Sequence, residues 1–186
     1  METTEKKIAA VETKWALDPS HSEIAFKVKH MMIANVKGLF KEFEINVTSN
    51  GVDFSDARID FQMKAASIET GDANRDGHLK SADFFDVENF PLITFKSNSL
   101  VNINDEIYVL DGDLTIRGVT KPVKLDVDFG GVLNDPWGNT KAGFTLNGKI
   151  SRKEFGLVWN AALESGGVLV GDDVKITCEV ELAKQA

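Results

Sequence analysis

The chain has 186 residues and a formal net charge of -8, which fits one domain and has the wrong sign for a nucleic-acid-binding protein. Its 21 lysines and arginines are scattered along the sequence, so no basic cluster offsets the acidic total. Twelve phenylalanines against one tyrosine indicate a large dry interior, because a buried tyrosine needs a partner for its hydroxyl.

No apolar run long enough for the core of a signal peptide follows Met1. No stretch approaches the ~20 apolar residues that a membrane-spanning helix needs. We therefore expect no integral membrane segment and a cytoplasmic protein, or a periplasmic one if the start is trimmed. The single cysteine, Cys178, excludes an intramolecular disulfide, and its apolar setting predicts a buried side chain.

Apolar and polar residues alternate in about eight segments, a pattern typical of strands with one dry and one wet face. In chain order these segments are 23–30, 43–47, 57–64, 93–95, 110–116, 123–129, 142–150 and 174–182. Turn sequences such as Ser49-Asn50-Gly51 and Asn104-Asp105 separate them. Such connections are too short for helical crossovers, so we expect antiparallel pairing.

One segment has a different period. Leu79, Ala82 and Phe85 recur at helical spacing, and Asp72 can cap the start of a helix. The sequence therefore predicts one helix over Ala73–Phe85.

The segment Asp72–Asp83 also has the oxygen spacing of a calcium loop. However, Asp83 stands where such loops carry Glu, and a predicted strand precedes the segment where a helix is needed. The three histidines show no metal-ligand spacing either. We therefore expect no metal and no cofactor.

Eight strands, each with one dry face, can close into a barrel or split into two packed sheets. Gly112 and Gly148 fall on the inward beat of their strands and favour a barrel with free space inside. The predicted fold is all-β, an eight-stranded antiparallel lipocalin-like barrel with one short helix closing an end. A packed β-sandwich that acts only through its surface is the alternative.

The inward positions of the predicted strands would line an apolar tunnel for a ligand. They are Phe26, Val28, Ile59, Phe61, Phe95, Leu114, Ile116, Phe144 and Leu146. His30 and Arg152 share this inward parity and are candidates for contact with a polar head group. His30 can equally be a histidine satisfied by backbone at a strand end, and Arg152 can equally pair with Glu154. Arg117 has outward parity and is the weakest candidate.

Motifs of nucleophilic catalysis and phosphate binding are absent from the sequence. Carboxylates are abundant but fall on outward, solvated positions, their ordinary place. We therefore expect a binding protein rather than an enzyme, with an enzyme that modifies a lipid as a further alternative.

Several motifs occur in order along the chain, among them Trp15–Phe26, Arg75–Leu79, Gly112–Pro122, Ser151–Gly156 and Val170–Val174. Together they resemble the YceI-like family of lipocalin-like polyisoprenoid-binding proteins. The resemblance runs roughly from Lys14 to Leu182. It implies a lipid-binding domain over residues 14–186, with residues 1–13 as an N-terminal extension.

This resemblance implies an extended eight-stranded barrel with a helix over one end and a long tunnel for an isoprenoid or similar lipid tail. It also implies a homodimer, which members of this family often form. The expected function is non-catalytic binding of such a lipid, for storage, sequestration or transport. Arg75–Leu79 belongs to the motif of the family, so the calcium-like spacing around it is expected to be coincidental.

Overall fold

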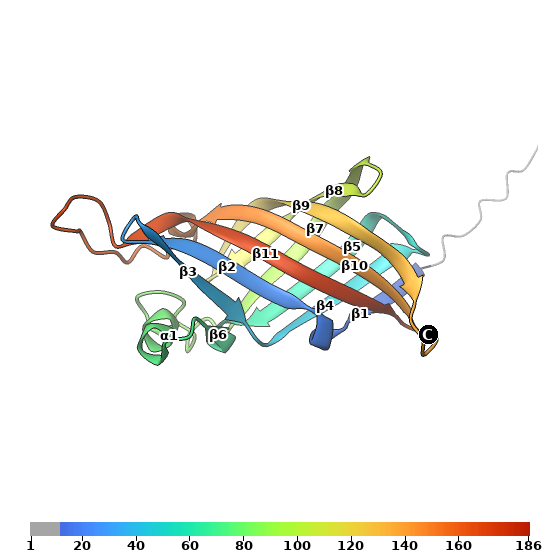
Figure 1. Ribbon diagram of the computed structural model, residues 1–186, viewed down its shortest axis with the longest axis horizontal. Helices are drawn as coiled ribbons and strands as arrows, with labels where there is room; N and C mark the ends of the chain where they lie inside the picture. Colours follow the sequence, from blue (N-terminus) through green and yellow to red (C-terminus); the bar gives the residue numbers. More distant parts are fainter. Residues whose placement is uncertain (1–11) are drawn as a thin grey trace, which may run out of the picture.

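The computed structural model describes residues 12–186, which form a long β-barrel with few other elements (Figure 1). The strands are β1 (Glu12–Leu17), β2 (Glu23–His30), β3 (Ala34–Phe40), β4 (Phe43–Asn50), β5 (Asp53–Lys64), β6 (Ile68–Glu69), β7 (Leu92–Asn104), β8 (Ile107–Ile116), β9 (Val119–Asn134), β10 (Thr140–Ser151) and β11 (Val170–Lys184). The helical elements are α1 (Ala73–Lys80) and the 3-10 turns η1 (Pro19–His21), η2 (Ala65–Ser67) and η3 (Arg152–Phe155).

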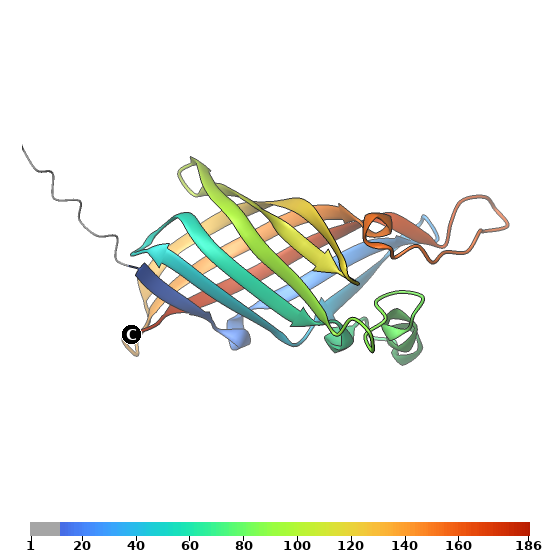
Figure 2. The same cartoon turned by 180° about the vertical axis from the view of Figure 1, so that it is seen from behind.

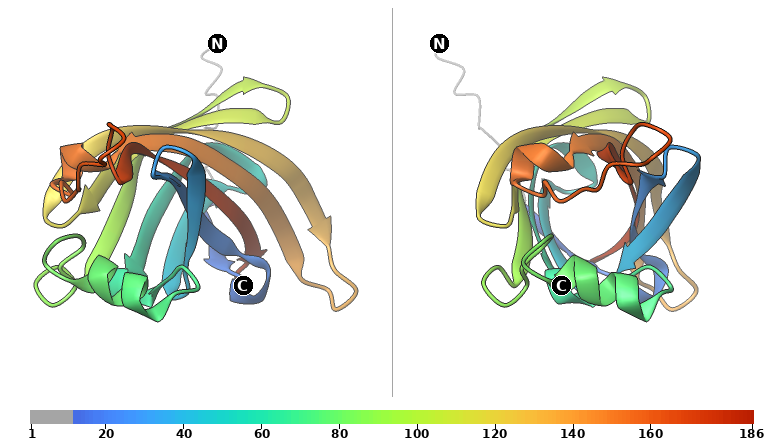
Figure 3. Two further views of the ribbon diagram at one scale, coloured as in Figure 1. Left: turned by 60° about the vertical axis from the view of Figure 1, so that its left-hand side comes forward. Right: turned by 90° about the vertical axis from the view of Figure 1, so that its left-hand side faces the viewer.

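Eight strands close the ring in the order β1-β4-β5-β7-β8-β9-β10-β11, and all neighbours are antiparallel (Figures 2 and 3). The last contact is between β1 and β11, where Trp15 lies opposite Lys184 and Leu17 opposite Leu182. The predicted eight-stranded antiparallel barrel is confirmed. The packed two-sheet sandwich is wrong, because the sheet closes on itself.

The remaining three strands lengthen the barrel at one end. β2 pairs with β11 and β3, and β3 pairs with the short β6. β1 and β2 lie along the same edge of β11 and are separated by η1, which begins at Pro19. Proline suits the first position of such a turn because its missing N–H would have no partner there. Side chains of β2 therefore alternate between inside and outside as those of the ring strands do, and Phe26 and Val28 face the same interior as the ring residues.

The end of the barrel away from α1 is filled by aromatic side chains. Phe54 packs at ring-centroid distances of 5.1 Å from Trp15, 5.4 Å from Phe129 and 4.9 Å from Phe144. The Trp15 indole N–H donates to Ser49 Oγ at 2.8 Å, which satisfies the one polar atom that this ring buries. This aromatic cluster closes that end of the interior.

Helix α1 is shorter than the sequence predicts: it ends at Lys80 instead of Phe85. The predicted cap is confirmed, since the Asp72 carboxylate accepts a hydrogen bond from Arg75 N at 2.9 Å. Beyond the helix the chain turns back, and Phe85 N donates to Leu79 O at 3.0 Å. The turn brings Leu79 and Phe85 together without a helix, so their spacing was misleading. No helix within residues 12–186 is long and apolar enough to cross a membrane.

The segment with calcium-like spacing is this capped helix and not an open loop. Asp76 accepts hydrogen bonds from the backbone N–H and the hydroxyl of Thr70, and Asp83 contacts His78 Nε2 at 2.8 Å. Calcium coordination in such motifs needs these oxygens to converge from an extended loop. Here they bind their own backbone and side-chain neighbours instead.

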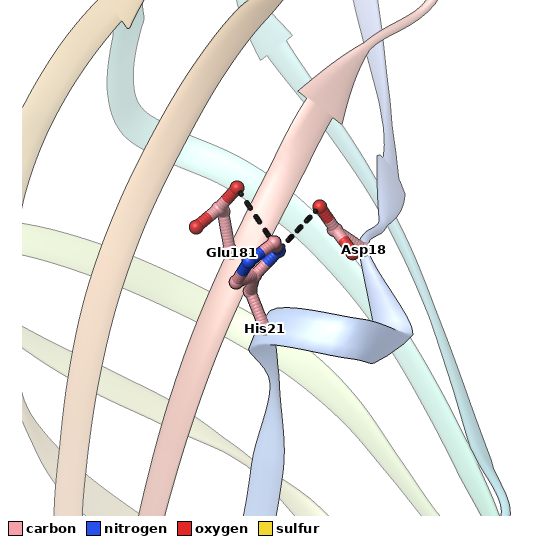
Figure 4. Close-up of side chains that lie close together, drawn as sticks. All are labelled: Asp18, His21 and Glu181. Atoms are coloured by element: carbon pink, nitrogen blue, oxygen red, sulfur yellow. Dashed lines mark hydrogen bonds and ion pairs between the residues drawn. The ribbon is translucent and has the colours of Figure 1, made fainter. Parts of the chain in front are cut away.

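A polar cluster joins η1 to the seam of the barrel. Lys141 Nζ lies 2.7 Å from Asp18 Oδ2 and 3.5 Å from Glu181 Oε1. His21 Nδ1 lies 3.0 Å from the same Asp18 oxygen and 3.9 Å from Glu181 (Figure 4). The hydrogen bond from Lys141 is the main reason that the pKa of Asp18 lies well below its ordinary value, and Asp18 in turn raises the pKa of His21. We call these four residues the seam cluster.

The seam cluster predicts a pH-dependent contribution to stability. The Asp18 and Lys141 side chains are only 14% and 19% exposed, so their ion pair should lie near the upper limit of about 1 kcal/mol for surface pairs. Lys141→Met should therefore lower the free energy of unfolding at neutral pH by about 1 kcal/mol. The folded-state pKa of Asp18 is depressed, so this contribution is present above its ordinary pKa and lost as pH falls below it. Urea titrations should therefore show the gap between wild type and variant narrowing in acid.

The matched control is Lys64→Met. Its ammonium lies 2.6 Å from Glu42 Oε2, but both side chains are well exposed, so we expect little change in stability. Equal losses in the two variants, or a gap that is the same at neutral and acid pH, would contradict the role given to the seam cluster.

Candidate ligand-binding cavity

An apolar cavity of about 200 Å³ lies inside the barrel, in the half nearer α1. Eight of the predicted tunnel residues line it: Phe26, Val28, Ile59, Phe61, Phe95, Leu114, Ile116 and Leu146. The ninth, Phe144, lines a second cavity of about 60 Å³ nearer the aromatic end. All nine side chains thus face internal space, and their contact with a ligand stays a prediction.

The two cavities meet at a shared wall. Five residues border both of them: Ile45, Ile59, Leu110, Leu146 and Val180. These are aliphatic side chains on the five strands β4, β5, β8, β10 and β11. Such side chains can change rotamer without losing a polar contact. A rearrangement of this wall would join the two spaces into one tunnel along the barrel.

Glycines keep the larger cavity open, although differently from what the sequence suggests. A Cβ atom added at Gly38 would collide with the Phe26 ring, and one at Gly112 would collide with the Phe95 ring. Gly148 is covered in the same way by Leu125. The expected free space beside Gly112 and Gly148 is therefore filled. The glycines instead let large side chains lie flat against the neighbouring strand, which keeps them out of the centre of the barrel.

The cavity ends at a mouth formed by segments outside the ring. Leu79 of α1, the turn residues Phe84 and Phe85, and Leu157 all line it. Residues 156–169, which we call the mouth loop, and α1 lie at the same end of the barrel (Figure 3). Trp159 of the mouth loop joins them, with its ring 4.6 Å from that of His78 and 5.4 Å from that of Phe84. Strand alternation does not detect these residues, because they lie on connections.

Arg152 is the one charged side chain in the cavity wall. It is 3% exposed, and its guanidinium donates to four backbone carbonyls: Gly171 at 2.8 Å, Leu157 at 2.6 Å, Trp159 at 2.9 Å and Val170 at 3.2 Å. Pairing with Glu154 is therefore wrong. Burial lowers the pKa of Arg152, and the charge of Asp172 opposes this shift. Arg152 thus fixes the mouth loop to the start of β11.

The other two polar candidates lie outside the cavity wall. His30 is half-buried at the end of β2, opposite Ala34 and Val170. Arg117 lies in the tight turn between β8 and β9, where its guanidinium donates to Phe84 O at 2.9 Å. Arg117 therefore supports the mouth from outside, in agreement with its outward parity. Neither residue contributes to the lining of the larger cavity.

The wall offers little chemistry. Within residues 12–186, its ionisable side chains are Arg152 and Cys178 alone. Burial raises the pKa of Cys178 to about 12, so the group is a neutral thiol near neutral pH. A metal could be considered only at Asp18, His21 and Glu181, the single group of suitable ligands in the described part of the chain. That position is held by the ammonium of Lys141.

Comparison with known proteins gives a consistent picture. The model of the YceI-like domain matches residues 15–182. UPF0312 protein SAB2563 of Staphylococcus aureus is 38% identical over 172 residues, which are 92% of this chain and 98% of the relative. The YceI protein of Campylobacter jejuni is 35% identical with a TM-score of 0.74, covering 91% of this chain and 97% of that one.

A more distant structure has the same fold. The polyisoprenoid binding domain from Saccharophagus degradans is 12% identical with a TM-score of 0.64. The match covers 92% of this chain and 98% of that domain. At this identity the similarity shows the fold alone.

The contacts of Arg152 predict local unfolding when it is replaced. Arg152→Met removes the donor for four carbonyl groups near the mouth. A hydrogen bond to a charged group contributes about 1.5–3 kcal/mol, but carbonyls near the surface can bond to water instead. We therefore expect the free energy of unfolding to fall by about 3 kcal/mol. Hydrogen exchange should accelerate most in residues 156–171. Lys153→Met, an exposed neighbour, serves as the control. Uniform acceleration over the whole barrel would contradict a local role.

Proposed function

The chain belongs to the YceI-like domain family, and we propose that it binds a long-chain isoprenoid or similar amphiphilic lipid inside its barrel without chemically changing it. The observation that carries this proposal is the apolar cavity inside the barrel, in which every lining side chain except Arg152 is hydrophobic. Apolar cavities of this kind stay dry and take up apolar guests. The related fold described as a polyisoprenoid binding domain supports the same class of ligand.

The dimensions support a flexible tail as the ligand. An engineered apolar cavity of about 150 Å³ holds a benzene molecule, so about 200 Å³ accommodates a short length of hydrocarbon chain. A longer tail would pass the shared wall and enter the second cavity beside Phe144. Contacts of this kind distinguish one methylene from none by only about 1–3 kcal/mol. We therefore infer broad selectivity for the tail.

A polar head would lie at the mouth, where Arg152 is the group best placed to contact it. A guanidinium has five N–H donors, and four of them are used by backbone carbonyls. The remaining N–H, on Nη2, could donate to one oxygen of the head group. His30 lies outside the cavity wall and would contact only a head group that reaches past the mouth loop.

The same wall argues against a lipid-modifying enzyme. An enzyme of this kind needs a nucleophile or an acid–base pair near the reacting atoms. Around this cavity, the described residues supply only the neutral thiol of Cys178 and the hydrogen-bonded guanidinium of Arg152. Binding for storage, sequestration or transport is therefore the function that the site supports best.

Gly38→Ala tests the proposal by pushing the Phe26 ring into the cavity. We expect the lipid found in an organic extract of purified protein, and the uptake of added isoprenoid alcohol, to fall sharply. Stability of the lipid-free protein should change little, because the ring moves into empty space. In a fully packed core the same substitution would cost about 1–3 kcal/mol. Both proteins are stripped of lipid before urea titration, since a bound ligand adds stability of its own.

Gly143→Ala is the matched control, because an added Cβ there has no neighbour within 4 Å. It should leave lipid content and stability unchanged. Wild-type protein that yields no lipid and takes up none would remove the basis of the proposed function.

A further inference from the structure

The turn between β2 and β3 exposes three consecutive apolar side chains, Met31, Met32 and Ile33. Ile33 is 83% exposed. Met31 and Met32 have φ angles of 52° and 62°, in the left-handed region that residues other than glycine rarely adopt. A turn of this shape would ordinarily carry Gly, Asn or Asp. Its apolar residues therefore require another explanation than the geometry of the turn.

This turn is fixed beside the mouth of the cavity. Met31 N donates to Leu169 O at 2.8 Å, and the Met32 sulfur occupies the space where Gly167 would carry a Cβ atom. The mouth loop exposes Val158 and Val168 as well. The turn and the mouth loop project from the same end of the barrel (Figures 1 and 3). We call Met31, Met32, Ile33, Val158 and Val168 the apolar rim.

A row of lysines crosses the outside of the adjacent wall. Lys37 on β3 lies opposite Lys27 on β2, Lys27 lies opposite Lys175 on β11, and Lys175 lies opposite Lys149 on β10. Their neighbours along the strands, such as Phe26 and Val28, line the cavity, so these lysines face outward. The expectation that the basic residues are scattered is wrong for this wall. We call these four residues the lysine row.

The lysine row has little compensation from the protein itself. Among its members, only Lys149 forms an ion pair within residues 12–186, with Asp173 at 3.4 Å. The hairpin of β2 and β3 contains Lys27, Lys29 and Lys37 against one carboxylate, that of Glu23 at its start, although the whole chain has a net charge of -8. Like charges directly opposite each other on a sheet are unfavourable. An external anion would relieve this repulsion.

We propose that the barrel docks on an anionic lipid bilayer, with the apolar rim inserted among the lipids and the lysine row facing the phosphates. Lys27 and Met31 are four residues apart, about 13 Å along a strand. A tilted barrel therefore brings both to the surface of one bilayer. Resting on the proposed function, this arrangement lets a lipid tail pass between bilayer and cavity without crossing water.

The two features together favour a bilayer over other occupants. A nucleic acid could neutralise the lysine row but offers nothing to the apolar rim. A second copy docked through the same face would form an isologous contact, in which the same surfaces meet and the two lysine rows repel each other. Lipid headgroups and acyl chains match the lysines and the rim at once.

The test uses the full chain, stripped of lipid, in sedimentation with vesicles of phosphatidylcholine and phosphatidylglycerol. Met32→Ser with Ile33→Ser should weaken vesicle binding by about ten-fold or more, since two large apolar side chains lose their burial. Lys27→Gln with Lys37→Gln should abolish the preference for vesicles that contain phosphatidylglycerol and the sensitivity of binding to salt.

The opposite end of the barrel provides the control. Trp137 is also 83% exposed, on the turn between β9 and β10, far from the mouth. Trp137→Ser should leave vesicle binding unchanged. All substituted side chains lie on the surface, and the thermal unfolding midpoint of each variant checks that it folds.

Three results would overturn the proposal. They are a wild type that does not sediment with anionic vesicles, a rim variant that binds as well as wild type, and a wild-type self-association that the rim variant abolishes. Equal affinity of wild type and rim variant for a short DNA duplex, with no vesicle binding, would assign the lysine row to nucleic acid.

Uptake of isoprenoid alcohol from detergent, measured on the rim variant, tests the cavity alone and should be unchanged. Wild-type protein that takes up the alcohol but does not dock on vesicles would contradict only the docking proposal. Wild-type protein that docks but takes up no alcohol would contradict only the proposed function.

Discussion

Closure between β1 and β11 is the constraint on which the rest of this structure depends. The contact is short, with three registered pairs from Trp15 to Leu17. It converts a curved sheet into a ring, so that every inward side chain faces the same enclosed space. Without it, the apolar faces of eight strands would be exposed along an open edge. The seam cluster lies next to this contact and ties η1 to β10 and β11 through Lys141 and Glu181.

The enclosed space is wider than its side chains fill, and glycine is one reason. Phe26 and Phe95 are large enough to reach into the centre of the barrel, but each lies over a glycine of the adjacent strand, Gly38 or Gly112. The aromatic cluster around Phe54 shows the opposite case, in which rings stack on one another and fill the end. The same residue type thus lines a cavity at one end of the barrel and closes it at the other. The difference lies in what stands opposite each ring.

The alternation of apolar residues was sufficient to predict the strands and their inward positions, because a strand has a period of two whatever its partner is. Alternation did not distinguish a barrel from a packed sandwich, and Gly112, Gly148 and the resemblance to the YceI-like family favoured the barrel. The mouth could not be predicted in this way. Leu157 and Phe84 lie on connections without period, and Arg152 bonds to carbonyls that no sequence pattern marks. The helix was overestimated because Phe85 folds back onto Leu79 by a turn with the same spacing.

The lysine row shows a further limit of reading along the chain. Lys27 and Lys37 are ten residues apart, and Lys149 and Lys175 are far from both in sequence. Their alignment depends on strand register, which hydrogen bonding and turn geometry determine. Each lysine occupies an ordinary outward position on its own strand, so only the assembled sheet reveals a charged row.

Arg152 joins the cavity wall to the segments that form the mouth. Burying a charge is costly unless hydrogen bonds compensate for it. Its planar fork reaches four carbonyls of the mouth loop and β11 at once, a geometry that the single ammonium of a lysine does not match. The same loop is held from its other side by the bond between Met31 N and Leu169 O. The mouth loop is therefore fixed on one side by Arg152 of the cavity wall and on the other by Met31 of the apolar rim, so that hydrogen bonds join the rim directly to the mouth.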